Sequence, residues 1–275
     1  MNFENLFICP LCKAELSFVS GALKCENRHS FDVSSSGYVN LLKPGKMNNS
    51  KAGDSKEMIK ARSDFFVSNA YEPIQEKIRS LSKELGGKRI IDAGCGEGYY
   101  TEAIAKANIN STVIGFDMSK FGCEHGAKSA KRQGLTNIAY CVSSIFEMPV
   151  KSESCNLIVN MFAPVANEEF FRVLCPGGYL IVASAGIEHL NGLKSVIYEE
   201  VYNNEEKILS YEGFELIACQ NLKYNTVISG NSTIQNLFKM TPYYHRTTLD
   251  DKKKLESVSE IDTTVEVNFA IYKRT

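Results

Sequence analysis

The sequence predicts a doubly wound α/β fold with a mostly parallel sheet, preceded by a small N-terminal metal-binding domain. From residue 88 onward, β-branched apolar runs alternate with helical patterns, which is the order that βαβ units produce. A glycine-rich turn joins the first of these strands to the first of these helices, and doubly wound sheets bind ligands at that edge. The residues before position 44 show neither feature and carry paired cysteines instead.

Four potential metal ligands stand in two close pairs near the N-terminus. Cys9, Cys12, Cys25 and His29 give the spacing C-x2-C-x12-C-x3-H. Tetrahedral Zn²⁺ prefers such ligands, and a segment this short cannot fold on its apolar surface alone. The alternative is a set of buried free thiols beside an exposed histidine, but four ligands in one small polar segment favour zinc. With no spare ligand and no carboxylate in ligand spacing, the zinc site is expected to be structural.

Short strands at 31–33 and 37–42 complete this first part. The polar stretch 47–56 is expected to be a linker and a possible lid, and helical patterns follow it from residue 54 or 55 and over 71–85. The chain therefore divides into a zinc-binding module over 1–43, a linker and helical lead-in over 44–87, and an α/β domain over 88–275.

The α/β domain has its elements in regular alternation. Its strands are expected at 88–93, 111–117, 137–142, 155–162 and 178–184, and its helices at 99–107, 119–133, 167–174 and 190–201. A turn over 176–178 should precede the fifth strand. Two later runs, 214–225 and 265–273, alternate apolar and polar residues as edge strands do, with a helix between them.

The turn after the first strand reads Asp92-x-Gly94-x-Gly96-x-Gly98. Alternate glycines let the backbone bend sharply and let a ligand approach the main chain. The spacing is not the G-x-G-x-x-G that seats a dinucleotide pyrophosphate, and an acid at the strand end would repel one. That acid suits a ligand with an ammonium group or ribose hydroxyls, and S-adenosylmethionine carries both.

The second strand also ends in an acid, Asp117, about 20 residues after the glycines, where α/β nucleotide sites place the carboxylate that binds ribose. The alternative is an Asp that caps the helix beginning near Ser119. The glycine turn follows one strand and Asp117 ends the next. Because both features lie at the ends of successive strands, we favour the cofactor site.

Composition limits the partners and the compartment. Lys and Arg number 31 against 32 Asp and Glu, so no overall field attracts nucleic acid and any basic surface must be local. No signal segment or membrane-spanning run is present, and the 9 cysteines are mostly scattered singly. We therefore expect a cytoplasmic protein with no membrane partner.

The motifs of the α/β domain resemble those of class I S-adenosylmethionine-dependent methyltransferases. They are Asp92 to Gly98, Asp117, Ser143-Ser144 with Met148-Pro149, and Arg172-Val173-Leu174-x-Pro176-Gly177-Gly178. The resemblance implies S-adenosyl-L-methionine as cofactor. The third strand of this superfamily usually ends in an acid that receives the adenine amino group, and Ser144 stands there instead. Adenine recognition would then depend on the backbone and on packing by Met118 and Ile145.

Flanking motifs narrow the resemblance to the bacterial large-subunit (23S) rRNA guanine-N1 methyltransferases. They are Cys9-Pro10-Leu11-Cys12, Arg28-His29-x-Phe31-Asp32, Gly37 to Leu42, Gly53-Asp54-Ser55-x-Glu57-Met58, Gly96 to Thr101 and Met240-Thr241-Pro242. The resemblance implies that the zinc module recognises a hairpin of 23S rRNA, that the α/β domain methylates a guanine there, and that the chain forms a homodimer. One branch of this family is linked to macrolide-type antibiotic resistance.

The resemblance also supplies candidate site residues. The cofactor set it implies comprises Tyr71, Asp92, Gly94, Gly96, Glu97, Gly98, Asp117, Ser144 and His189. Without it, Tyr71 would be read as a core residue and His189 as a surface histidine. A guanine N1 carries a proton that something must accept, and Asp54 and Glu57, with Glu97 and His189, are the candidates. Spacing singles out none of them.

Basic side chains interleaved with aromatic ones offer RNA contacts, although they also fit an ordinary solvated surface. They are Lys13, Lys24, Arg28, Lys43, Lys46, Lys51 and Arg62, with Phe18, Phe31 and Tyr38.

Two other functions stay open. One is methylation of a different RNA, a protein or a small molecule, with the zinc module as a docking element. The other is a zinc adaptor without activity, which the intact glycine turn and Asp117 disfavour.

Overall fold

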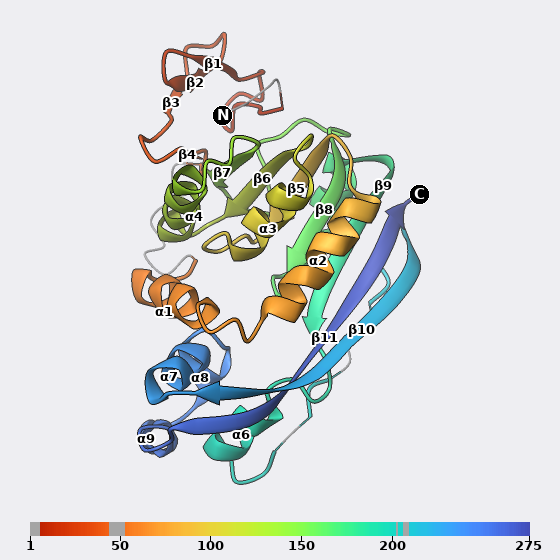
Figure 1. Ribbon diagram of the computed structural model, residues 1–275. Coiled ribbons are helices and arrows are strands. Elements are labelled where there is room, and N and C mark those ends of the chain that lie inside the picture. Colours follow the sequence, from red (N-terminus) through yellow and green to blue (C-terminus); the bar gives the residue numbers. More distant parts are fainter. Residues whose placement is uncertain (1–5, 44–52, 202, 206–208) are drawn as a thin grey trace.

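A mixed sheet forms the centre of the computed structural model, which describes residues 6–43, 53–201, 203–205 and 209–275 (Figure 1). The sheet is eight-stranded, in the order β10-β11-β9-β8-β5-β6-β7-β4. Its strands are β4 (Tyr38–Asn40), β5 (Arg89–Ala93), β6 (Thr112–Asp117), β7 (Ile138–Val142), β8 (Cys155–Met161), β9 (Leu174–Ala185), β10 (Phe214–Ser229) and β11 (Glu260–Arg274). From β9 to β4 all neighbours run parallel, whereas β11 runs antiparallel to both β9 and β10. The predicted mostly parallel, doubly wound sheet is confirmed.

The helices are α1 (Lys56–Phe66), α2 (Glu72–Leu85), α3 (Tyr99–Ala107), α4 (Lys120–Arg132), α5 (Asn167–Val173), α6 (Asn191–Ile197), α7 (Asn231–Lys239), α8 (Tyr243–Arg246) and α9 (Leu249–Lys254). Helices α1 to α5 and α7 lie close to the predicted positions, α6 is four residues shorter at its C-terminal end than predicted, and α8 and α9 were not predicted. Ser55 caps α1 by accepting the Met58 amide, and Ser119 caps α4 by accepting the Gly122 amide. None of the helices in the described part of the chain is long and apolar enough to cross a membrane.

The two faces of the sheet are covered differently. Helices α2, α3 and α4 pack on one face, with side chains such as Ile78 and Ile104. On the other face, residues 143–154 connect β7 to β8 without a helix. The N-terminal segment takes that place, because Phe7 and Leu16 are fully buried in the same cluster as Phe116 of β6. The metal-binding segment is therefore packed on the sheet and is part of the core.

The first part of the chain differs from the prediction in one strand. β1 (Ser17–Val19), β2 (Ala22–Lys24) and β3 (Ser30–Asp32) form a separate three-stranded antiparallel sheet. The strand expected over 37–42 does not join it. It forms β4, which pairs in parallel with β7, Tyr38 opposite Tyr140. Tyr38 and Val39 are buried by this pairing, which explains why β4 completes the large sheet.

The C-terminal strands also differ from the prediction. Of these two strands, only β10 lies at an edge of the sheet, since β11 lies between it and β9. The consecutive buried residues from Val265 to Tyr272 explain this, because a strand covered on both faces needs no polar alternation. The turn expected at 176–178 lies within β9, where Gly177 has a φ of 75° and the register with β8 shifts. Beyond the parallel strands, β10 and β11 curve toward α6 to α9 (Figure 1).

Candidate cofactor site and metal cluster

The glycine turn follows β5 and leads into α3. Gly94, Gly96 and Gly98 have φ values of 87°, 54° and 93°, so each lies in the left-handed region that other residues rarely adopt. A Cβ at Gly98 would lie 2.3 Å from Tyr140 Oη, and one at Gly94 would lie 2.6 Å from Ala163 Cβ. The backbone conformation thus favours glycine at all three positions, and the space available also requires it at Gly94 and Gly98.

Asp117 at the end of β6 holds this turn. Its Oδ2 accepts the Gly96 amide at 3.0 Å, and its Oδ1 accepts the Ser119 amide at 2.6 Å. Burial raises the pKa of the Asp117 carboxyl, and the two amides partly offset that rise. Ser119, and not Asp117, provides the side-chain cap of α4. The alternative role considered for Asp117 is therefore excluded. The Asp117 carboxylate instead bridges the glycine turn that follows β5 and the start of α4 that follows β6.

Asp92 is almost fully buried at the end of β5. Its Oδ2 accepts the hydroxyl of Thr101 at 2.6 Å, whereas its Oδ1 has no hydrogen-bond partner among the described residues. Burial raises the pKa of Asp92 to about 7, and the charges of Asp117 and Glu97 add to this. A buried carboxylate oxygen without a partner fits a ligand with a cationic group, and the glycine turn fits a ligand that approaches the backbone closely. The residues therefore fit S-adenosylmethionine.

Arg62 of α1 forms ion pairs with two carboxylates beside the glycine turn. Arg62 Nη1 lies 2.5 Å from Asp54 Oδ2 and 3.3 Å from Glu97 Oε2. Burial raises the pKa of Glu97, and the charge of Arg62 opposes that rise. The hydroxyl of Ser119 donates to the Asp54 carbonyl at 2.8 Å, so the segment before α1 lies against the start of α4. Residues 53–55, predicted to be part of the linker and possible lid over 47–56, thus pack beside Asp117.

Tyr71 and His189 lie together although 118 residues separate them, with Oη and Nε2 3.2 Å apart. The Glu266 amide donates to His189 Nδ1 at 3.2 Å, so the ring proton is on Nε2 and points to Tyr71. Burial lowers the pKa of His189 to about 4, which keeps the ring neutral at pH 7. A neutral imidazole with both nitrogens engaged is a poor general base.

The other predicted proton acceptors are no better suited than His189 to act as a general base. Asp54 and Glu97 share Arg62, and Glu57 is exposed on the first turn of α1. Ser144 is buried, and its hydroxyl oxygen accepts the Phe146 amide at 3.2 Å. Its role at the adenine stays a prediction.

Sequence reasoning missed the residues that follow β8. Phe162 has a left-handed backbone with a φ of 55°, and its side chain is 43% exposed. Its ring lies 6.1 Å from that of His189, at an interplanar angle of 30°. Asn160 is fully buried and donates to the carbonyls of Ala93 and Pro164, while its Oδ1 has no partner in the described residues. The signal available was an aromatic residue at the carboxyl end of a parallel strand, followed by Ala-Pro.

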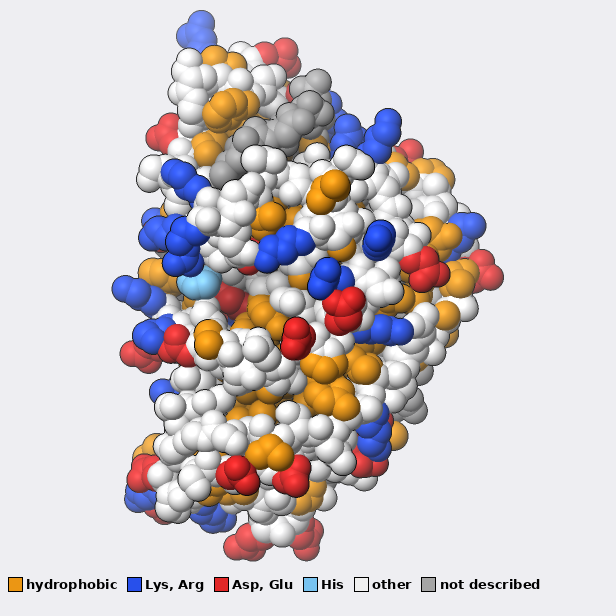
Figure 2. Space-filling view, in the orientation of Figure 1, with side chains coloured by type: hydrophobic (Ala, Val, Ile, Leu, Met, Phe, Trp, Pro, Cys, Tyr) orange, Lys and Arg blue, Asp and Glu red, His pale blue; other side chains and the backbone are white. Residues whose placement is uncertain are grey.

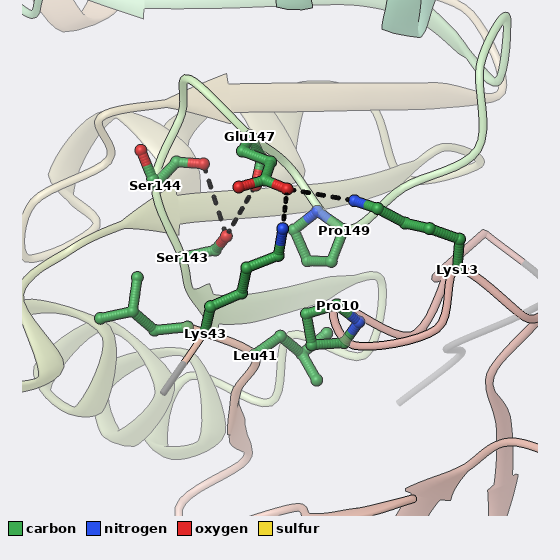
Figure 3. Close-up of a pocket in the computed structure, with 9 residues that line it drawn as sticks. Pro10, Lys13, Leu41, Lys43, Ser143, Ser144, Glu147 and Pro149 are labelled. Atoms are coloured by element: carbon green, nitrogen blue, oxygen red, sulfur yellow. Dashed lines mark hydrogen bonds and ion pairs between the residues drawn. The ribbon is translucent and has the colours of Figure 1, made fainter. Parts of the chain in front are cut away.

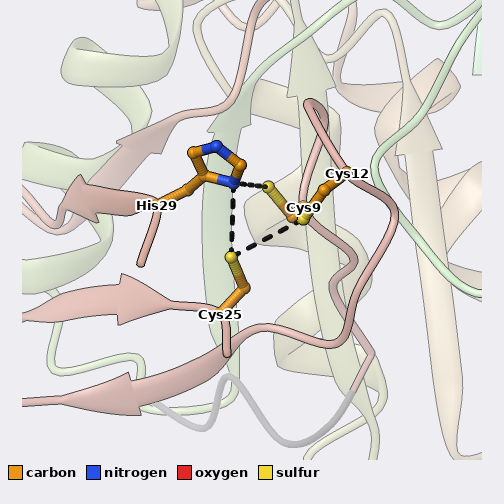
Figure 4. Close-up of side chains that lie close together, drawn as sticks. All are labelled: Cys9, Cys12, Cys25 and His29. Carbon is orange, nitrogen blue, oxygen red and sulfur yellow. Dashed lines mark hydrogen bonds between the residues drawn. The ribbon is translucent and has the colours of Figure 1, made fainter. Parts of the chain in front are cut away.

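The four predicted zinc ligands come together in the N-terminal segment (Figure 4). Their ligand atoms all lie within 4.8 Å of one another. Cys12 Sγ and Cys25 Sγ are 3.7 Å apart, and His29 Nδ1 is 3.4 Å from the Sγ atoms of Cys9 and Cys25. Tetrahedral Zn²⁺ with bonds of about 2.3 Å to sulfur and 2.0–2.1 Å to nitrogen requires separations of about 3.8 and 3.6 Å. The donor set and its spacing therefore fit a structural zinc ion.

The predicted RNA contacts are placed unequally. Arg62 is paired with two carboxylates and Tyr38 is buried in the sheet, so neither fits the role expected of it. Lys46 and Lys51 lie outside the described residues. The remaining side chains are exposed or half-buried, and they are Lys13, Lys24, Arg28, Lys43, Phe18 and Phe31.

Two family models match the chain. One, described as a methyltransferase domain, matches residues 84–256, and the other, described as RlmA, N-terminal, is a zinc ribbon and matches residues 7–51.

Three curated relatives are similar to this chain over different shares of its length. A 23S rRNA (guanine(748)-N(1))-methyltransferase from Streptomyces fradiae is 30% identical over 195 residues, covering 69% of this chain and 66% of that one. A putative 23S rRNA (guanine-N(1)-)-methyltransferase from Micromonospora griseorubida is 31% identical, with 66% of each chain covered. The putative 23S rRNA (guanine-N(1)-)-methyltransferase YxjB of Bacillus subtilis is 29% identical, covering 97% of this chain and 96% of that one. The match thus spans about two thirds of the first two relatives and nearly all of the third.

Proposed function

The chain belongs to the methyltransferase family and carries the RlmA-type zinc ribbon, and on this premise we propose that it methylates N1 of a guanine in a hairpin of 23S rRNA. The observation that carries the proposal is that the zinc-ligand segment and the glycine turn belong to one packed structure. Phe7 beside the cluster contacts Phe116 of β6 with ring centroids 6.2 Å apart, and Asp117 follows directly. An RNA held by the zinc module would therefore lie close to the cofactor.

The cofactor half of the proposal assigns roles to the residues around the turn. S-adenosylmethionine supplies an already activated methyl group when bound. Gly96 and its neighbours offer the backbone, Asp117 accepts the ribose hydroxyls, and Asp92 faces the cationic part of the ligand. Tyr71 and His189 form the opposite side of the site. The chain then has to align the acceptor nitrogen with the methyl group, because positioning contributes most of the rate in such a transfer.

The guanine half of the proposal depends on Phe162. A base in a stack must leave it to reach the cofactor, at a cost of a few kcal/mol that is lower in a loop. An exposed ring at the carboxyl end of β8, beside the glycine turn, offers a new stacking surface worth about 1–3 kcal/mol per base. The left-handed φ of Phe162 is a local strain of a kind that clusters at functional sites.

The direct test is methyl transfer from tritiated S-adenosylmethionine to unmethylated 23S rRNA. We expect nuclease-sensitive incorporation and a block to primer extension at one guanine, because a methyl group on N1 occupies the pairing edge. Incorporation that survives nuclease, or that needs a protein or small molecule in place of RNA, would show the alternative docking role of the zinc module.

Phe162 gives a more specific test. Phe162→Ala should lower turnover about tenfold or more, whereas Phe162→Tyr should keep most of it, because only the flat ring is needed. Affinity for S-adenosylhomocysteine should be unchanged in both variants, as measured by isothermal titration. Equal turnover in the Ala and Tyr variants would exclude a stacking role.

We also propose that the protein acts in the cytoplasm, where its rRNA substrate lies, and as a homodimer. Sedimentation at micromolar concentration tests the second point, and a monomer that methylates RNA would contradict it.

A further inference from the structure

Two lysines from different segments meet one carboxylate at the junction between the zinc-ligand segment and the α/β domain (Figure 3). Lys13, just after Cys12, places Nζ 3.2 Å from Glu147 Oε1. Lys43, which follows β4, pairs with the same oxygen. Glu147 belongs to the connection between β7 and β8. These three side chains border a pocket that also includes Pro10, Leu41, Leu42, Ser143, Ser144 and Pro149.

The geometry is that of an anion site. Lys13 directly follows the zinc ligand Cys12 and has a left-handed backbone with a φ of 63°. One carboxylate cannot neutralise two ammonium groups, whereas a phosphate offers several oxygens and strong charge-assisted hydrogen bonds. The pocket between the lysines therefore suits a tetrahedral anion better than it suits a single carboxylate.

The pairing is also easily exchanged. The side chains of Lys13, Lys43 and Glu147 are 53%, 34% and 33% exposed, and ion pairs with such exposure contribute at most about fivefold to an equilibrium constant. The backbone around Glu147 is held independently, because the Glu147 amide donates to the Ser144 carbonyl at 3.3 Å and Arg172 donates to the Met148 carbonyl at 3.1 Å. The Glu147 side chain can swing away while its loop stays in place.

We propose that Lys13 and Lys43 form a binding site for one backbone phosphate of RNA and that Glu147 occupies this site until RNA displaces it. The proposal rests on the proposed function only in taking RNA as the source of the phosphate. Lys13 reaches the site from the zinc-ligand segment and Lys43 from the large sheet, so a phosphate there would join both parts of the molecule. Charges of both signs are interspersed on the face drawn in Figure 2, and the total charge is near zero, so RNA affinity depends on such local sites.

The decisive variant is Glu147→Gln, which removes the competing charge and keeps the shape of the side chain. We expect RNA affinity to rise about three- to tenfold in a filter-binding assay at 0.1 M salt. The matched control is Glu124→Gln on α4, where a glutamate of 34% exposure pairs with one lysine, Lys128, at 2.6 Å. Both variants change the net charge equally, so a response of the same size in both would overturn the proposal.

Substitution of the two lysines, alone and together with Glu147→Gln, completes a mutant cycle. Lys13→Ala with Lys43→Ala should weaken RNA binding and reduce the slope of log K against log salt by about 0.7–0.9 for each lost phosphate contact. In that background Glu147→Gln should have no further effect, because the site it guards is gone. Lys43→Arg should keep the wild-type slope, since the charge is retained. An effect of Glu147→Gln that persists without the lysines would overturn the assignment.

The RNA probes separate this inference from the proposed function. One is a 23S rRNA hairpin and the other an unrelated hairpin of equal length, and a phosphate site should respond with both. If the wild type methylates rRNA while all variants bind RNA alike, the phosphate site is wrong and the proposed function stands. If no RNA is methylated while Glu147→Gln binds both hairpins more tightly and the double lysine variant binds both more weakly, the phosphate site stands and the proposed function is wrong.

Discussion

The zinc cluster is assembled from residues close in sequence, whereas the cofactor site is assembled from residues far apart in sequence. Cys9 and His29, the outermost zinc ligands, are 20 residues apart, whereas Tyr71 and His189 are 118 apart. The cluster needs little beyond two tight turns to bring its ligands together. The cofactor site exists only after β5, β6 and β8 have paired in one sheet. A local site can thus be stabilised by its ligand, while a long-range site depends on the whole core.

The largest effect should come from removing the metal. Cys12→Ser should abolish stoichiometric zinc and lower the melting temperature by roughly 10 °C, because the disordered segment would uncover the sheet face that Phe7 and Leu16 bury. Affinity for S-adenosylhomocysteine at low temperature should stay within a few-fold, since no zinc ligand reaches the cofactor site.

Elemental analysis, calorimetry and titration measure these three quantities. Cys219→Ser is the control, because this exposed cysteine lies on β10, outside the cluster. An unchanged melting temperature in Cys12→Ser would mean that the zinc cluster does not stabilise the core.

An intermediate effect is expected at Asp117. Asp117→Ala should weaken binding of S-adenosylhomocysteine by about 1.5–3 kcal/mol, the usual contribution of hydrogen bonds to a charged group. It also removes the acceptor of the Gly96 amide, so the glycine turn should become less ordered. Asp117→Asn should lose less, because one acceptor oxygen remains. Isothermal titration gives the affinities, and equal affinity in all three proteins would exclude Asp117 from the ribose site.

The smallest effect should be a gain in stability at Asp92. Its pKa is about 7 in the folded protein against an ordinary value of 3.8, so the folded state binds the proton more tightly than the unfolded state does. Stability contributed by this group is therefore lost as the pH rises from about 4 to 7. Asp92→Asn removes the buried charge and should raise the free energy of unfolding at pH 8 by about 1–2 kcal/mol, with little change at pH 4.

The same substitution should weaken cofactor binding, because the oxygen without a partner loses its charge. Denaturant titrations at both pH values measure the stability. A variant that is less stable than the wild type at pH 8 would show that Asp92 is neutralised in another way.

Local chemistry explains what the sequence could predict. The glycines were recognisable because each occupies a left-handed φ that other residues avoid, and the zinc ligands because their types and spacing are both restrictive. Ser55 and Ser119 likewise mark helix starts by a rule that involves neighbours only. Within the cofactor site, the roles of the residues brought together stay predictions until they are measured.

The remaining features depend on partners that the pattern of a segment does not specify. Tyr38 is apolar enough for a strand in either sheet, and only the space beside β7 decides between them. Arg62 looks like a surface cation until Asp54 and Glu97 are placed beside it. Periodicity also misplaced β11, whose polar residues Glu266 and Asn268 are buried through hydrogen bonds to β10 and to residue 188.

The parallel pairing of Tyr38 with Tyr140 has a consequence for biosynthesis. About a hundred residues separate these strands, and ribosomes add roughly 5–20 residues per second, so the N-terminal segment waits on the order of 5–20 s for the surface on which it packs. Apolar residues such as Phe7 and Leu16 are exposed during that interval. A metal ion captured by the nascent segment would keep it folded until β7 emerges, and chaperone demand should therefore rise when cellular zinc is scarce.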